Sequence, residues 1–503
     1  MIADPSSGGI LPDIGKEATE AWQLLVHVCR RWRSLVFGSP RRLNLRLFCT
    51  SETPIRDTLE IWPALLLVVD SGVMAFSSSM DNIFGALEQS NRVCKVNLYV
   101  TSSLLEKVLA QMQVPFPELT DLRLSKFYSF DETPPFIPDS FLGGSTPRLR
   151  HLTLDGIPFP GLPKLLLTAT HLVDLMLTFI PYSENFSPKA MAALLSALSR
   201  LRILSLIFQP RQPGTGSGWE SQSLPLRSIL PALDHFIFNG DTEYLEDFVT
   251  HIDAPQLNKM DITLYSQIGT PRLAQFINRT SLRAGDKALV EFYNLSATVQ
   301  LPARVEDLRI SIYCNAPGLQ LSSVAHVCNP LHSFSTVEDL YIGRPNLRLA
   351  WIDEAIESTL WLQLLRPFTA VKNLYLSNVF APIIAAALQE FIGDIADVLP
   401  SLQNIFVERL EPSDFLQENF RQFVTARQLS DHPIAVFDWI SENESHATRK
   451  LRPCSPSFTF ILYYSSRARS LMLLNSPHLL LTSFFLLNVS PCLGIAKRKR
   501  KVR

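Results

Sequence analysis

The chain has 503 residues, of which 47% are apolar and 18% charged, and its 35 prolines outnumber its 20 glycines. This composition excludes a disordered chain, because it supplies enough apolar side chains for a large core. The formal charge of −1 excludes a protein that holds nucleic acid through its global charge. Six positive charges lie in residues 497–503, which leaves residues 1–496 with a net charge of −7. The body of the chain is therefore mildly acidic.

The first periodic segment is a short amphipathic helix near the N-terminus. Residues 1–20 are expected to be disordered, because they begin with a stretch rich in Pro, Gly and Ser. Apolar residues then recur at steps of three and four, which predicts a helix from about Lys16 to Val36. The helix is expected to end near Gly38, where glycine supplies a left-handed cap and Pro40 prevents continuation. Spacing alone is typical of any amphipathic helix with a solvated basic side.

The residues of this helix carry a family resemblance. The stretch AWQLLVHVCRRWRSL (21–35), followed by Gly38-Ser39-Pro40-Arg41, closely resembles the second half of an F-box, in the version found in fungal F-box proteins with irregular leucine-rich repeats. The resemblance implies a helical module that docks on the Skp adaptor of a cullin–RING ubiquitin ligase. It also implies that the packing and docking positions are Leu25, Val28, Cys29, Trp32 and Leu35.

The opening of the family's module is not recognisable before this stretch. The family begins with a Leu-Pro-x-Glu turn and a first helix, whereas Leu11-Pro12 is followed by Asp-Ile-Gly. We therefore expect an F-box that is truncated at its N-terminus.

A short hydrophobic frame, h-x-x-h-x-h with h apolar, recurs along the rest of the chain. The frame alone is a weak signal, but its spacing is mostly 23–34 residues, which matches one leucine-rich repeat or slightly more. A single gap of 48 residues is expected to hold one degenerate unit around residues 289–292. The frames start at Val93, Leu119, Leu149, Leu172, Leu201, Leu233, Leu257, Val305, Val337, Val371 and Leu402.

Helical patterns lie between the frames, for example at Leu104–Met112, Pro188–Leu198 and Ile383–Val398. Alternating strands and helices imply right-handed crossovers and a parallel sheet. We therefore predict an α/β fold, a short helical F-box-like segment followed by a leucine-rich-repeat-like solenoid with parallel strands on its concave face. The x positions should point outward there and form a partner-binding surface. These positions include Asp121, Arg123, His151, Asp174, His235, Lys259, Asp307, Arg309, Asp339, Tyr341, Asn373, Tyr375 and Phe406.

The predicted organisation has five parts. A disordered N-terminus (1–20) precedes a partial F-box-like segment (21–62), and a connector (63–90) leads to the repeat domain (91–447). An atypical hydrophobic and basic tail (448–503) closes the chain.

Catalytic and metal chemistry find little support in the sequence. The seven cysteines show no CxxC spacing, and no signal sequence is recognisable, so we expect a reducing cytoplasmic or nuclear compartment. His326, Cys328, His332 and Cys314 supply four donors, but their spacing fits no standard zinc module. A glycine-rich run at 214–218 lacks the flanking strand, helix and lysine of a phosphate loop. We predict no catalytic residues, no metal and no cofactor.

The tail leaves three alternatives open. Residues 470–496 are apolar and end in a basic run, Lys497 to Arg503, as a membrane helix with a cytoplasmic flank would. Pro477 and Pro491 interrupt the run and make a membrane anchor the minor alternative. A disordered stretch or translated intron, and a final docked helix, are the others. The basic run also resembles a nuclear localisation signal.

Two functional hypotheses follow. In the first, the chain is the substrate receptor of a Skp–cullin–F-box ubiquitin ligase, with a Skp-type adaptor, the cullin complex and an unknown protein substrate as partners. In the second, it is a non-catalytic repeat scaffold whose N-terminal helix only caps the first repeat. Neither hypothesis includes nucleic acid as a partner.

Overall fold

The structure of the chain is a computed structural model. All residues that it describes belong to one compact unit, which spans Ala21–Ser441. The described residues are 28–38, 46–61, 65–72, 80–127, 136–157, 162–180, 187–209, 227–265, 270–282, 285–302, 307–314, 316–343, 357–390, 398–408, 422–425, 427–428 and 434–439.

One sheet of sixteen strands runs through this unit, and nearly all of its strands are parallel. Its spatial order is β1-β2-β3-β4-β5-β6-β7-β9-β11-β14-β13-β12-β15-β16-β17-β18. The strands are β1 (Arg46–Cys49), β2 (Leu66–Asp70), β3 (Val93–Val100), β4 (Asp121–Lys126), β5 (His151–Asp155), β6 (Asp174–Ile180), β7 (Ile203–Phe208), β9 (His235–Gly240), β11 (Lys259–Leu264), β12 (Lys287–Phe292), β13 (Ser296–Pro302), β14 (Asp307–Tyr313), β15 (Asp339–Gly343), β16 (Asn373–Leu376), β17 (Asn404–Glu408) and β18 (Ala435–Trp439).

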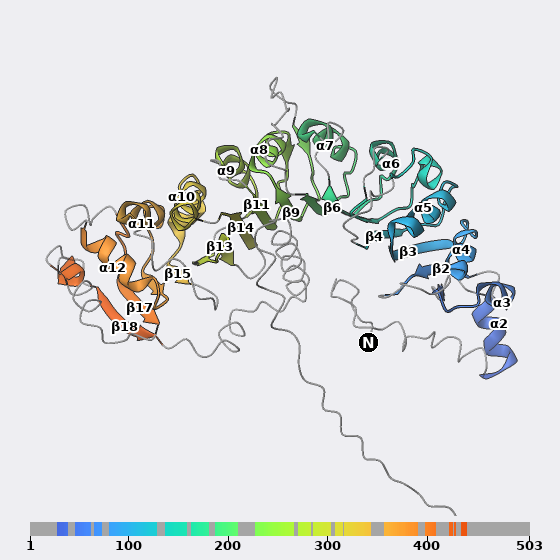
Figure 1. The fold of residues 1–503 in the computed structure, drawn as a ribbon, viewed down its shortest axis with the longest axis horizontal. Helices are drawn as coiled ribbons and strands as arrows, with labels where there is room; N and C mark the ends of the chain where they lie inside the picture. The colour runs from blue at the N-terminus through green and yellow to red at the C-terminus, as the bar shows by residue number, and fades with distance from the viewer. Residues whose placement is uncertain are drawn as a thin grey trace, which may run out of the picture. The chain divides into compact units, whose positions relative to one another are not determined.

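Helices connect the strands and cover one face of the sheet (Figure 1). Consecutive helices pack side by side, as parallel strands with right-handed crossovers require. A second small sheet pairs β8 (Ser228–Ile229) with β10 (Ile252–Asp253). The helices are α2 (Arg30–Gly38), α3 (Ile55–Ile61), α4 (Asp81–Leu87), α5 (Ser102–Gln111), α6 (Leu162–Thr168), α7 (Pro188–Leu195), α8 (Thr242–Thr250), α9 (Pro271–Ile277), α10 (Pro317–Cys328), α11 (Ser358–Leu365) and α12 (Ala381–Glu390), with the 3-10 turns η1 (Phe141–Gly144) and η3 (His332–Thr336).

The predicted frames coincide with the strands. Each of the eleven frames contains a strand of the large sheet, and all but β3 begin two residues after the frame starts. The apolar h positions are buried, as Leu122, Leu152 and Leu175 on neighbouring strands show. These leucines also lie in register with one another, so each repeat places its core residues directly beside those of the next. The predicted α/β repeat fold is confirmed.

The sheet begins earlier than the sequence indicated. β1 and β2 pair with each other and with β3 in parallel register, although they lie in the predicted F-box-like segment and connector. Leu47 and Leu67 are buried, and α3 packs on α4. β2 is apolar at four of its five positions, as strands covered on both faces are, so it lacks the polar outward residues of the other strands.

The long gap between frames holds an insertion that reverses one strand. β12 forms where the degenerate unit was expected, but it lies beside β15 and not beside β11. β13 then runs antiparallel to both β12 and β14, and β14 returns to pair with β11. A tight turn joins β12 to β13, closed by the amide of Tyr293, which donates to the carbonyl of Ser296 at 2.8 Å. Such a turn is too short for a crossover connection. Strands joined so closely can pair only antiparallel, which makes β13 the exception to the parallel expectation.

The segment 129–147 is rich in proline and glycine, as loops inserted at the edge of a repeat are. Its described residues form η1, and Phe141 and Leu142 are buried in the core. The amide of Leu142 donates to the carbonyl of Met112 at 2.6 Å, which fastens this turn to the end of α5. This turn occupies the place of a helix in its repeat.

The turn depends on the conformation of Gly143. Its φ is +67°, and an added Cβ would lie 2.9 Å from the backbone nitrogen of Pro115. Both the left-handed backbone and the close approach favour glycine. We expect Gly143→Ala to lower the free energy of unfolding by about 1–3 kcal/mol in urea denaturation. Gly343→Ala is the matched control, because no described residue beyond its chain neighbours lies within 4 Å of its Cβ position. Equal stability of the two variants would contradict this account of the turn.

Candidate functional site

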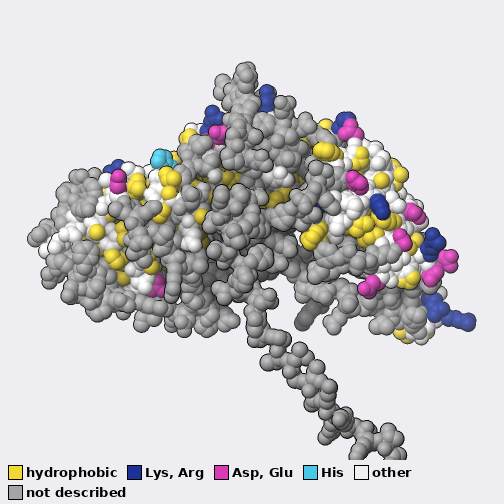
Figure 2. Space-filling view, in the orientation of Figure 1, with side chains coloured by type: hydrophobic (Ala, Val, Ile, Leu, Met, Phe, Trp, Pro, Cys, Tyr) yellow, Lys and Arg dark blue, Asp and Glu magenta, His cyan; other side chains and the backbone are white. Residues whose placement is uncertain are grey.

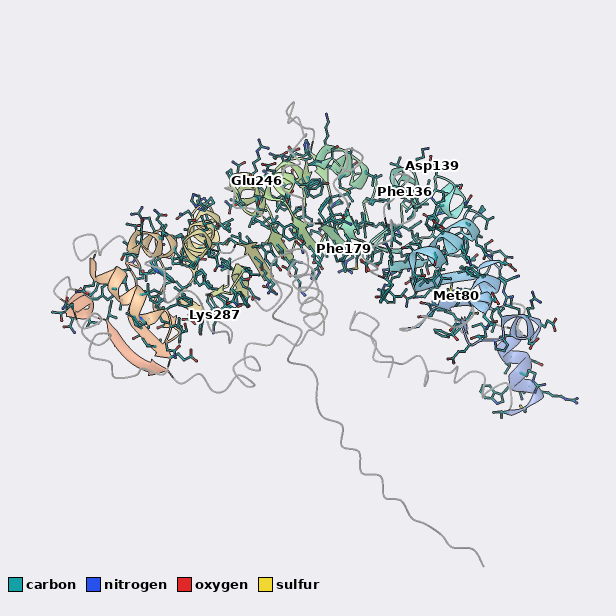
Figure 3. All side chains as sticks on the ribbon, viewed as in Figure 1. Met80, Phe136, Asp139, Phe179, Glu246 and Lys287 are labelled. Atoms are coloured by element: carbon teal, nitrogen blue, oxygen red, sulfur yellow. The ribbon has the colours of Figure 1, made fainter. Side chains whose placement is uncertain are left out.

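The face of the large sheet opposite the helices, called the strand face below, carries the candidate site. Strand side chains alternate between the core and this face. Figure 3 shows the contrast between Glu246, among the helices, and Lys287, on the strand side. Because the strands are in register, the outward side chains form rows that cross the sheet. The first row contains Lys95, Asp121, His151, Asp174, Ile203, His235, Lys259 and Asp307.

The second row lies one outward position further along each strand. It contains Asn97, Arg123, Thr153, Met176, Ser205, Ile237, Asp261, Arg309, Gln300, Leu289, Tyr341, Tyr375 and Phe406. The first row resumes after the insertion with Lys287, Asp339, Asn373 and Asn404.

The structure places all the predicted partner-binding residues on β4 to β17, at outward positions of these two rows. Each of them is at least partly exposed: Asp121, Arg123, His151, Asp174, His235, Lys259, Asp307, Arg309, Asp339, Tyr341, Asn373, Tyr375 and Phe406. The register brings them into one continuous surface. Contact with a partner stays a prediction for each of them.

Charges of alternating sign compensate one another in the first half of the first row. Lys95 Nζ lies 2.9 Å from Asp121 Oδ1, and His151 Nδ1 lies 2.6 Å from Asp174 Oδ2. Burial alone would raise the pKa of Asp121, but hydrogen bonds from Lys95 and Thr120 hold it below its ordinary value. The hydrogen bond to Asp174 raises the pKa of His151 against the effect of its own burial. These four side chains form a charge ladder across β3 to β6.

A second histidine of the same row behaves in the opposite way. His235 lies between Ile203 and Lys259 rather than between two carboxylates. Burial and the Lys259 ammonium lower its pKa. The pKa of a histidine on this surface therefore depends on its burial and on the charged side chains around it.

The insertion concentrates carboxylates in the middle of the strand face. Burial raises the pKa values of Asp261, Asp307 and Glu291, with Arg309 nearby as the common opposing charge. The amide of Gln300 donates to Asp307 at 3.2 Å, and the hydroxyl of Tyr293 donates to Glu291 at 2.9 Å. Hydrogen bonds from the added hairpin therefore stabilise acids that a regular repeat would leave without these partners.

Aromatic rings occupy the C-terminal end of the second row. Tyr341 and Tyr375 stack with centroids 4.2 Å apart, and Tyr375 stacks on Phe406 at 4.6 Å. Beside them, the amide of Asn404 donates to Asn373, and that of Asn373 donates to Asp339, both at 2.8 Å. The result is an apolar centre with a polar rim, the usual anatomy of a protein interface.

Sequence reasoning missed the strand-face residues of the insertion. Leu289, Glu291, Thr298 and Gln300 join the two rows through β12 and β13. The signal was present, since residues 287–292 and 296–302 each alternate between apolar and polar side chains around a short turn. The repeat frame did not include it, because a hairpin does not follow the period of the repeats.

The N-terminal helix exposes its apolar side chains. Val28, Trp32 and Leu35 are 65%, 47% and 55% exposed, and Cys29 is exposed as well. Leu25 lies outside the described residues. Figure 2 shows basic and acidic side chains interspersed with hydrophobic ones over the end of the unit that carries α2 to α6.

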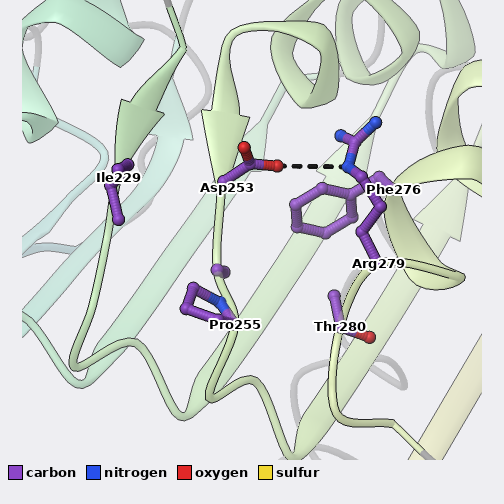
Figure 4. Close-up of a pocket in the computed structure, with 7 residues that line it drawn as sticks. Ile229, Asp253, Pro255, Phe276, Arg279 and Thr280 are labelled. Atoms are coloured by element: carbon purple, nitrogen blue, oxygen red, sulfur yellow. Dashed lines mark hydrogen bonds and ion pairs between the residues drawn. The ribbon is translucent and has the colours of Figure 1, made fainter.

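A shallow pocket of about 320 Å³ lies between the β8–β10 ribbon and the end of α9 (Figure 4). Its walls include Ile229, Pro255 and Phe276, and its charged groups pair with each other, Arg279 Nε lying 3.1 Å from Asp253 Oδ1. This ion pair compensates the two charged side chains that line the pocket.

The cysteine and histidine candidates for a metal do not gather. Burial raises the pKa of Cys328, which is fully buried in α10, while His326 bonds the carbonyl of Ser322 at 2.7 Å. Within the described ranges, no three His, Cys, Asp or Glu side chains are placed to hold a metal ion. No helix in the described part of the chain is long and apolar enough to cross a bilayer. The apolar run at 470–496 lies outside that part.

Comparison with known proteins adds little to this geometry. No protein-family model and no curated protein matches the sequence. The crystal structure of the leucine-rich repeat-containing protein LegL7 from Legionella pneumophila is similar at 12% identity, over 75% of this chain and 97% of that one, with a TM-score of 0.25. Likeness at this level carries no argument. The strand order and the repeat spacing identify the fold as a leucine-rich-repeat-like α/β solenoid.

The charge ladder predicts a pH dependence. The pKa of His151 is raised in the folded chain, so its contribution to stability is complete below the unfolded pKa of about 6.5 and is lost as pH rises through the folded pKa. We expect Asp174→Asn to return the His151 pKa toward its ordinary value and to reduce the loss of stability between pH 6 and pH 8. NMR titration of the imidazole protons measures the first effect. Asp339→Asn on distant β15 should change neither the His151 pKa nor the pH dependence of stability. An unchanged His151 pKa in Asp174→Asn would show that Asp174 does not stabilise the protonated imidazole.

Proposed function

We propose that this chain is the substrate-receptor, F-box-type subunit of a Skp–cullin–F-box ubiquitin ligase. The N-terminal helix would bind the Skp-type adaptor, and the strand face would bind the target protein. The subunit would carry out no chemistry itself. It would act by proximity, raising the effective concentration of the target near a charged ubiquitin-conjugating enzyme.

The exposed apolar face of α2 is the observation that supports adaptor binding. Trp32 and Leu35 lie one helical turn apart on the same side of α2, and Val28 lies two residues before α2 begins. An isolated apolar stripe of this kind, on a short helix, gains stability only by packing against something. Large aromatic side chains in such a position are frequent centres of protein interfaces.

The alternative is a repeat scaffold in which the helix caps the first repeat. A cap would bury its apolar side chains against the open end of the sheet, as terminal repeats do. Trp32 is 47% exposed and Leu35 is 55% exposed, which disfavours a cap. β1 and α3 provide the end of the solenoid instead, with Leu47 and Ile55 buried.

Support for target binding comes from the strand face. Its rows combine aromatic rings, amides and charges of both signs, and the register between neighbouring repeats aligns them across the sheet. Repeat proteins use extended surfaces of this kind for protein contacts. Single-sign charge, which would favour nucleic acid, is absent from the charge ladder.

The test is capture of the purified Skp adaptor by the full chain. We expect Trp32→Ala to weaken capture by about 2 kcal/mol or more, because truncating a central aromatic residue removes most of its contact. The same variant should change the free energy of unfolding by less than about 0.5 kcal/mol, because the side chain packs little in the free chain.

Ser34→Ala, on the opposite side of the same helix, is the matched control and should bind as the parent does. Equal capture by the parent and by Trp32→Ala, or no capture by the parent, would exclude the adaptor role. A large loss of stability in Trp32→Ala would favour the capped scaffold.

A further inference from the structure

An apolar stripe crosses the C-terminal strands of the strand face. Leu289, Tyr341, Tyr375 and Phe406 lie in register on β12, β15, β16 and β17, and we call these four residues the aromatic stripe. At a strand spacing of about 4.8 Å it is about 14 Å long and one side chain wide. Three of its members are the stacked rings described above.

Stacking decides what the stripe offers to a partner. The two faces of the Tyr375 ring are covered by Tyr341 and Phe406, which lie nearly parallel to it at 6° and 10°. The ring edges, which carry partial positive charge, therefore point outward in place of the π faces. Burial raises the pKa values of Tyr341 and Tyr375, so their hydroxyls stay protonated at neutral pH. The stripe is therefore a surface for apolar contact and hydrogen bonding. A positively charged side chain of a partner would bind beside it rather than on it.

Such a partner lies beside the stripe, where Gly343 leaves a space. Among the described residues other than its two chain neighbours, no atom lies within 4 Å of the position that a Cβ on Gly343 would occupy. Glu291 lies in register with Gly343 on one side. On the other side, the amide of Ser377 donates to the carbonyl of Ile342 at 3.0 Å, which places Ser377 next to Gly343. We call this space the glycine gap.

The groups around the glycine gap suit a cationic donor. Glu291 accepts a hydrogen bond from Tyr293, and burial raises its pKa although that hydrogen bond and the charge of Arg309 act in the opposite direction. Ser377 is 7% exposed, and its Oγ has no hydrogen-bond partner among the described residues. A buried hydroxyl and a buried carboxylate without full partners cost stability until a donor reaches them.

We propose that the glycine gap binds an arginine or lysine side chain of the partner protein, while neighbouring apolar residues of that partner pack along the aromatic stripe. This inference rests on the proposed role of the strand face in binding a protein. An acidic rim, Glu291 on one side of the stripe and Asp339 on the other, complements a basic segment. Asp339 also lies 3.7 Å from Lys287 Nζ, so part of its charge is already balanced.

The partner segment is extended rather than helical. Asn373 and Asn404 border the stripe, and each uses one amide hydrogen within the chain of bonds to Asp339, which leaves the second. These hydrogens need carbonyl acceptors. A helix satisfies its own carbonyls, whereas an extended or polyproline segment keeps them free.

The test uses the full chain and a fluorescent eight-residue peptide with a central arginine flanked by leucines and prolines. We expect the arginine peptide to bind and its glutamate counterpart not to bind, in fluorescence polarisation. Gly343→Val places a side chain in the gap, since Gly343 is not among the residues with positive φ and no described residue contacts its Cβ position. It should weaken binding by roughly tenfold or more, and Glu291→Gln should do the same.

Thr153→Val, a matched substitution on β5 of the same face, should leave peptide affinity unchanged. Equal binding of the two peptides, parent affinity in Gly343→Val, or no binding of the arginine peptide at millimolar concentration would each overturn the proposal. Adaptor capture by Gly343→Val should equal that of the parent. Failure of the peptide test and failure of the adaptor test are therefore separate results.

Discussion

Residue-for-residue register between neighbouring repeats is the constraint on which the rest of this molecule depends. Main-chain hydrogen bonds join Leu122, Leu152 and Leu175 as direct neighbours, and each of these leucines is buried. Once the leucines are aligned, the residues before them must align as well, which brings Asp121, His151 and Asp174 together. A slip by one residue in any strand would exchange its core and surface side chains, so burial of the leucines also specifies the surface.

The same constraint explains why charged, polar and apolar side chains are interspersed on the strand face. The repeats align side chains without regard to their chemistry, so the neighbours of a residue are set by strand order alone. A histidine between two aspartates keeps its proton more firmly, and one between an isoleucine and a lysine loses it more readily. The insertion also creates neighbours that the order of the repeats would not. It places Leu289 and Glu291 of β12 beside β15, a strand that lies about 50 residues further along the chain. Both the aromatic stripe and the glycine gap depend on that rearrangement.

The two candidate surfaces therefore differ in origin. The apolar face of α2 is local, since its residues are neighbours within two turns of one helix and need no other element to form. The strand-face surfaces exist only in the assembled sheet. Substitutions in α2 should therefore affect binding alone, whereas substitutions along the strands must be chosen with care to leave the core intact, as at Gly343 and Thr153.

The sequence by itself determined the position of eleven strands, their buried leucines, the end of α2 and the outward positions of the strand face. Alternation along a strand and the spacing of a helix are properties of neighbouring residues, and a single chain displays them directly. Only the tertiary structure decided the strand order around β12 to β14, the participation of β1 and β2 in the sheet, the burial of Phe141 and the exposure of Trp32. These features arise from contacts between residues that are far apart in the chain, and no local pattern encodes them.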